Sequence, residues 1–108
     1  MENFPGWQKK AFLEEMDSYE EARELLEIFQ KSSLNLLSEI EKALKEGNLS
    51  KARDKAHSLK GACATIFFEE ARLKAYEIEK APDLQTAQKV FTRLQKLLKE
   101  FLKEIANF

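Results

Sequence analysis

Apolar residues recur every three or four positions over two long stretches of this chain, and this spacing limits the folds it can adopt. The first stretch begins near residue 18 and predicts a helix whose buried stripe is Ala22, Leu25, Leu26, Phe29, Leu36, Leu37, Ile40 and Leu44. The second begins near residue 83 and predicts a stripe of Leu84, Ala87, Val90, Phe91, Leu94, Leu97, Leu98, Phe101 and Ile105. Such stripes are buried by packing helices on one another, so an all-α fold is expected.

Two shorter helices are expected between the long ones. The first follows Gly47 and is capped by Asn48 or Ser50. Its buried side is predicted to consist of Leu49, Ala52, Ala56, Leu59, Cys63 and Ile66. The second runs from about residue 69 to 80, with apolar contacts through Leu73, Tyr76 and Ile78.

Residues at the helix boundaries support this division. Ser18 and Glu21 form the capping-box pattern before the first long helix. Pro82 ends the short helix, and Asp83 caps the last one. Four helices joined by short turns predict an antiparallel up-down-up-down four-helix bundle over residues 18–108.

The first 17 residues are expected to form a separate N-terminal segment. They contain one short helix that packs on the bundle through Phe4, Trp7, Phe12, Leu13 and Met16. A chain of 108 residues is long enough for one domain with one core.

Composition excludes several classes of function. The chain has 18 Lys and Arg against 19 Asp and Glu, so no basic surface for nucleic acid is expected. No apolar run approaches the ~20 residues that cross a bilayer, and the N-terminus lacks the features of a signal peptide. One cysteine rules out an internal disulfide and fits the reducing cytoplasm. The sequence has neither a phosphate-binding loop nor an acidic metal cluster, so no bound cofactor or metal is expected.

The chemistry of the chain centres on His57, its one histidine. On a helix, Lys60 lies roughly 60° to one side of His57 and Gly61 roughly 40° to the other. Ala64 falls within about 20° of His57 and Arg53 within about 40°. This face therefore combines an imidazole with two cations and two very small residues. An exposed imidazole beside a cation, with room for a partner to approach, can accept a phosphoryl group.

Gly61 needs an explanation, because glycine inside a helix costs roughly 1 kcal/mol relative to alanine. One reading is that Gly61 lets another surface come close to His57. The other is that it relieves crowding against a neighbouring helix. Helix geometry leaves both open.

Glu79 is the predicted partner of the imidazole. If the second and third bundle helices form a hairpin about Phe68, then His57 and Glu79 lie at the same height, eleven residues on either side. A carboxylate that accepts the Nδ1 hydrogen would fix the tautomer and leave Nε2 as the nucleophile. The alternative is a solvated Glu79. A shifted register would substitute one of its neighbours, Tyr76, Glu77 or Lys80.

The string Ala56-His57-Ser58-Leu59-Lys60-Gly61-Ala62-Cys63-Ala64 resembles the histidine-containing phosphotransfer (HPt) family, whose signature is His-x-x-Lys-Gly. The similarity extends over about residues 18–108. Glu79 stands where the phosphoacceptor domain of chemotaxis-type histidine kinases has a glutamate beside the histidine. Phe67 departs from the pattern, because the family commonly has glycine there. Phe67 and Phe68 are candidate docking contacts, although burial in the core is the favoured reading for Phe68.

The resemblance implies a phosphorelay intermediate and not an independent enzyme. Nε2 of His57 would exchange a phosphoryl group with an aspartate of response-regulator receiver domains, and a sensor histidine kinase is a further partner. Lys60 would offset the phosphoryl charge, with a weaker contribution from Arg53. Gly61 and Ala64 would leave room for the partner, which would bring Mg²⁺. The protein is expected to be a cytoplasmic monomer.

The sequence also suggests other functions. A relay-inactive HPt-like adaptor, which binds a receiver or kinase without phosphoryl transfer, is suggested by the departure at Phe67. A purely structural bundle would leave His57 as a boundary residue. An enzyme that uses His57 with Cys63 fails on geometry, since Cys63 lies roughly 120° away on the core stripe.

Overall fold

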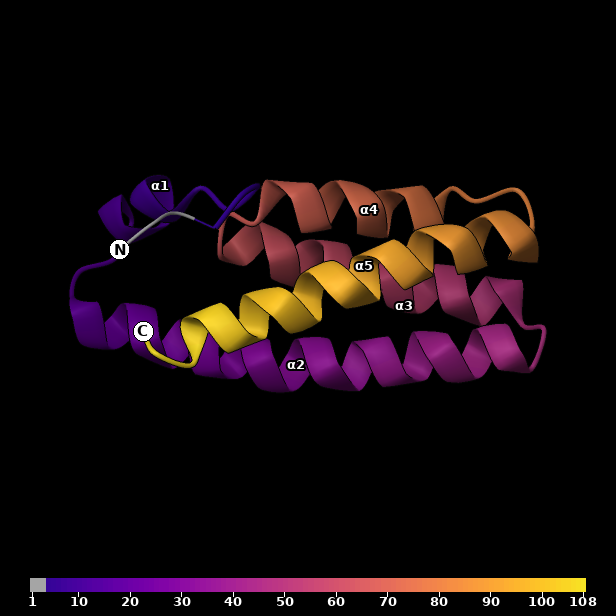
Figure 1. Cartoon of the computed structure of the whole chain (residues 1–108), viewed down its shortest axis with the longest axis horizontal. Helices are drawn as coiled ribbons and strands as arrows, with labels where there is room; N and C mark the ends of the chain where they lie inside the picture. Colours follow the sequence, from indigo (N-terminus) through magenta and orange to yellow (C-terminus); the bar gives the residue numbers. More distant parts are fainter. Residues whose placement is uncertain (1–3) are drawn as a thin grey trace.

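The computed structural model describes residues 4–108, which form five helices and no strand (Figure 1). The helices are α1 (Lys9–Glu14), α2 (Tyr19–Lys45), α3 (Leu49–Thr65), α4 (Glu69–Glu79) and α5 (Leu84–Ile105). Short connections join them into an elongated molecule of 42 × 21 × 21 Å. The all-α prediction is therefore confirmed.

Three predicted capping side chains begin the main helices. Ser18, Asn48 and Asp83 each accept a hydrogen bond from the backbone N–H three residues further on, at 3.1, 3.0 and 2.7 Å. Of the two caps expected for α3, the structure uses Asn48 and not Ser50. Gly47 ends α2 with φ of +72°, a conformation that costs glycine little.

Helices α2 to α5 pack in a closed sequence of neighbours. α2 contacts α3, α3 contacts α4, α4 contacts α5, and α5 returns to α2. The ring of Phe101 on α5 lies at the centre of an aromatic group, with ring centroids 4.3–5.9 Å from those of Phe4, Trp7, Phe29 and Phe68. The N-terminal segment thus shares the core of the bundle.

The inner face of α4 differs from the sequence prediction. Leu73 and Tyr76 were expected to be buried, yet they are 48% and 42% exposed. The buried residues of α4 are Ala71, Ala75 and Ile78. Because α4 lies against both α3 and α5, small alanines on its inner side let the three backbones come close. The two larger side chains are left on the outer surface.

The connection between α3 and α4 decides between the two readings of Phe68. α3 ends at Thr65, and Phe68 is completely buried, so Phe68 cannot be an exposed docking contact. Phe67 is half-buried, and its backbone has φ of +63°. Residues other than glycine rarely adopt this left-handed conformation. This residue turns the chain from α3 into α4.

The N-terminal segment is fastened to this connection. Within residues 4–108, four hydrogen bonds of 2.8–3.2 Å join the two: Trp7 Nε1 to the Ile66 carbonyl, the Gln8 N–H to the Phe67 carbonyl, the Glu69 N–H to Gln8 Oε1, and the Glu70 N–H to the Gly6 carbonyl. Phe68 provides no side-chain cap for α4. The N-terminal segment therefore satisfies the first free amides of that helix.

Candidate functional site

The hairpin of α3 and α4 brings His57 and Glu79 together. Nδ1 of His57 lies 2.9 Å from Oε2 of Glu79, at the register expected from their equal distance to the turn. The imidazole is 65% exposed, whereas the carboxylate is only 19% exposed. When Nδ1 donates its hydrogen to the carboxylate, the lone pair of the neutral ring is on Nε2, the nitrogen not held by Glu79.

Lys60 shares the same carboxylate. Its Nζ lies 2.7 Å from Oε1 of Glu79, so one glutamate holds both the imidazole and the ammonium group. The ammonium also lies 5.2 Å from the ring centroid of Tyr76, and Nζ of Lys80 lies 5.7 Å from that ring. Tyr76 thus adjoins the site through a cation–π contact. The sequence had predicted Tyr76 as an apolar contact and not as a neighbour of Lys60.

Glu79 is held in its ionised form. The hydrogen bond from Lys60 is the main reason that the pKa of Glu79 lies below its ordinary value, and the bond from His57 adds to it against partial burial. An ionised carboxylate accepts hydrogen bonds and donates none. The hydrogen between Glu79 and His57 therefore belongs to Nδ1.

The surface beside His57 is open at Gly61 and Ala64, which are both exposed. A Cβ atom added to Gly61 would meet no atom within 4 Å. Crowding against a neighbouring helix therefore does not account for the glycine among residues 4–108. Of the two readings of Gly61, the approach of another molecule stays a prediction.

Arg53 makes its contact elsewhere. Its Nη2 donates to the carbonyl of Ala81, 2.5 Å away, just beyond the end of α4. Within residues 4–108, the hydrogen bond of His57 is to Glu79 and not to Arg53. The structure thus brings Lys60 to the imidazole through Glu79, while Arg53 fastens α3 to the connection between α4 and α5.

Other chemistry finds little support in the described part of the chain. Cys63 is completely buried, and burial raises the pKa of its thiol to about 12, so the reactive thiolate is not formed. Residues 4–108 contain no group of three or more His, Cys, Asp or Glu that could hold a metal ion. In the same residues, no helix is both long and apolar enough to cross a membrane.

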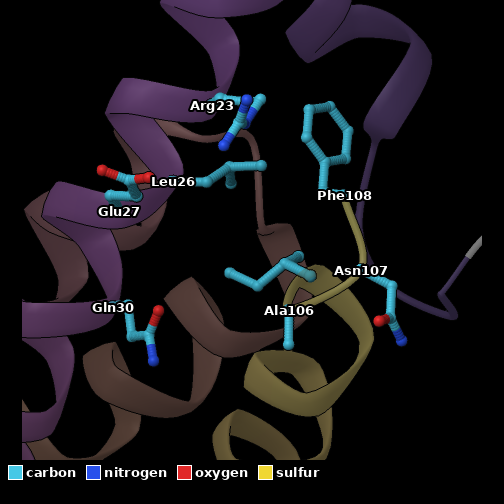
Figure 2. A pocket seen from close by; sticks show the side chains of 8 residues that line it. Arg23, Leu26, Glu27, Gln30, Ala106, Asn107 and Phe108 are labelled. Carbon is cyan, nitrogen blue, oxygen red and sulfur yellow. The ribbon is translucent and has the colours of Figure 1, made fainter.

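Two hollows lie on different sides of the molecule. One, of about 360 Å³, is formed by α2 and the C-terminal end of α5, with Arg23, Leu26 and Phe108 among its residues (Figure 2). No residue of α3 or α4 lines it, so it is separate from His57. The other, of about 440 Å³, lies at the connection between α3 and α4, and Ala64 is part of its lining.

Comparison with known proteins identifies the family of the chain. Searches of curated proteins and of solved structures found no match. The sequence profile of the Hpt domain matches residues 24–107, which is most of the chain and includes His57, Lys60, Gly61 and Glu79. Hpt domains carry phosphoryl groups on histidine in phosphorelays. The chain belongs to the Hpt domain family.

Proposed function

We propose that this protein is a histidine phosphotransfer protein of a two-component phosphorelay, which accepts a phosphoryl group on His57 and exchanges it with an aspartate of receiver domains. The observation that carries the proposal is the exposed imidazole whose Nδ1 is held by Glu79. Its Nε2 adjoins a surface that the chain leaves open at Gly61.

The transfer step uses groups of the two proteins, together with the Mg²⁺ that the receiver brings. The Nε2 lone pair attacks the phosphorus of the aspartyl phosphate, the N–P bond forms, and the P–O bond to the aspartate breaks. The bonding electrons leave with the aspartate carboxylate. The ring becomes positively charged and keeps its hydrogen on Nδ1, where Glu79 stabilises the charge. The reverse reaction passes the phosphoryl group to another receiver.

The neighbours of His57 contribute position and charge, which dominate phosphoryl transfer. Lys60 offsets the negative charge of the phosphoryl group, and Arg53 adds a weaker contribution at longer range. Gly61 and Ala64 leave room for the partner, and Phe67 is a docking contact. Each role is consistent with the exposure of Gly61 and Ala64 and with the partial exposure of the other three.

The proposal also covers the location, oligomeric state, partners and domain organisation of the protein. It is a cytoplasmic monomer that carries phosphoryl groups and is not an independent catalyst. Its partners are receiver domains, which bring Mg²⁺, and a sensor histidine kinase. Residues 1–17, of which 1–3 lie outside the described residues, are the N-terminal segment, and residues 18–108 form an up-down-up-down antiparallel bundle. The short connections and the closed sequence of helix contacts support this bundle.

The test is transfer from receiver domains charged with acetyl phosphate, in the presence of Mg²⁺, to wild type and His57→Gln. Wild type should gain an acid-labile, alkali-stable label, and the variant should gain none. Because His57 is exposed, the variant should keep the circular dichroism spectrum and melting temperature of wild type. Label retained on the variant would exclude His57 as the acceptor.

A relay-inactive adaptor is the second candidate, favoured by one observation. Phe67 lies near the face of His57, where its half-buried ring changes the surface that a partner would meet. An adaptor would bind a receiver with equal affinity in wild type and His57→Gln, and neither protein would become labelled. Label on wild type would exclude this candidate.

A further inference from the structure

The hollow at the connection between α3 and α4 is lined by apolar residues and by two residues of opposite charge. Its lining consists of Gln8, Ala64, Phe67, Phe68, Glu69 and Arg72. Nε of Arg72 lies 2.7 Å from a carboxylate oxygen of Glu69, so these two charges neutralise one another. With its charged groups already paired, the hollow is suited to an apolar side chain and not to an ion.

The hollow is continuous with the face of His57. Ala64 lies about 20° from His57 around the helix and about 10 Å further along it. The same Ala64 lines the hollow. Gly61, which lies between His57 and Ala64 along the helix, leaves the path open, because even an added Cβ atom would meet nothing within 4 Å there.

A partner that reaches His57 also reaches this hollow. A standard protein interface covers about 800 Å² on each partner, which is a disc of roughly 16 Å radius. Ala64, about 10 Å from His57 by helix rise, falls well inside such a disc when His57 is at its centre. Apolar side chains that fill pockets inside an interface contribute most of the binding energy.

We infer that this hollow receives an apolar side chain of the receiver domain while the receiver's aspartate reaches His57. The inference rests on the proposed function and adds to it a determinant of partner choice. Gln8 is important here because it lies outside residues 24–107, the part that matches the family. Its backbone and side chain are both hydrogen-bonded to the α3–α4 connection, so the N-terminal segment supplies a fixed wall of the pocket.

The test compares Ala64→Gln with Ser50→Gln. Both positions are exposed, and each lies seven residues from His57 along α3, in opposite directions. Only Ala64 adjoins the hollow. Filling the hollow beside Ala64 should raise the KM for the phosphorylated receiver at least tenfold in Ala64→Gln. Ser50→Gln and the conservative Ala64→Ser should stay within about threefold of wild type, because neither change fills the hollow.

A small phosphodonor separates the docking effect from the chemistry. Phosphoramidate needs no docking surface, so its labelling of wild type on His57 reports the chemistry apart from docking. Equal KM values for Ala64→Gln and wild type, with normal labelling, would overturn the role of the hollow and leave the relay function standing. Absence of label on wild type from both phosphoramidate and receivers would instead overturn the relay function. Light scattering that finds a wild-type dimer and a monomeric Ala64→Gln would assign the hollow to a second copy and overturn the inference.

Discussion

Replacing Gly61 with alanine should stabilise the protein and at the same time slow its reaction with a receiver. Alanine is favoured over glycine by about 1 kcal/mol inside a helix. The added Cβ meets no atom within 4 Å, so no strain reduces this gain. Unfolding entropy of about 2.1 cal/mol/K per residue gives about 0.23 kcal/mol/K for 108 residues. The melting temperature should therefore rise by about 4 °C.

The assay has a stability arm and a transfer arm. Thermal and urea unfolding, followed by circular dichroism, measure the gain in the free energy of unfolding. Rapid-quench transfer from a phosphorylated receiver measures the rate for wild type, Gly61→Ala and the bulkier Gly61→Gln. The rate should fall in that order, because a growing side chain obstructs the approach to His57.

Ala64→Gly is the matched control, since Ala64 is exposed on the same face of α3. Ala64→Gly should lose about 1 kcal/mol of stability without obstructing the partner. Across the variants, the change in transfer rate should therefore not correlate with the change in stability. A Gly61→Ala variant with unchanged or lower stability would refute the claim that this site is open. Unchanged transfer in Gly61→Gln would remove Gly61 from the interface.

Three further predictions concern the turn, the core and the site. Phe67→Gly should be more stable than Phe67→Ala by about 1 kcal/mol in urea unfolding. Both variants lose the ring, and only glycine is unstrained at φ of +63°. The reverse order of stability would contradict the left-handed turn. The Cys63 thiol, with its pKa of about 12, should resist iodoacetamide at pH 8 until urea unfolds the protein, and rapid alkylation of the native state would disprove its burial. Because the pKa of Glu79 lies below its ordinary value of 4.5, its ion pairs stabilise the fold fully above that pH and are lost as the pH falls through the lowered pKa. Glu79→Gln should therefore flatten the decrease in melting temperature between pH 6 and 3. In the same variant, ¹⁵N NMR should show more of the Nε2–H tautomer of His57. An unchanged pH profile and an unchanged tautomer ratio would exclude the pairing of Glu79 with His57.

Much of the fold could be predicted from the sequence where one strong local signal was sufficient. The caps Ser18 and Asp83 and the apolar stripes of α2 and α5 are signals of this kind. The inner face of α4 could not be predicted in this way, because hydrophobicity alone favours burial of Leu73 over burial of Ala71. The packing of α4 depends on how closely three helices approach, and that distance is a property of the whole bundle.

The site was predictable to a similar extent. The contact between His57 and Glu79 follows from their equal distance to the turn, so counting residues was enough. The hydrogen bonds of the N-terminal segment were not predictable, since they join mainly backbone groups about 60 residues apart and leave no pattern in the sequence. The left-handed Phe67 was also missed, because phenylalanine gives no sign of that conformation.

Gly61 and Phe67 together oppose local stability in the same short region. A glycine occupies an open helical position where alanine would be more stable, and a phenylalanine occupies a left-handed position where glycine would be less strained. Conflicts between local preference and structure are most common at functional surfaces, where another requirement outweighs stability. Gly61 lies between His57 and Ala64 along α3, and Phe67 lines the hollow together with Ala64. Each costs the free protein about 1 kcal/mol, and for each the surface assigned to the receiver domain supplies a physical reason.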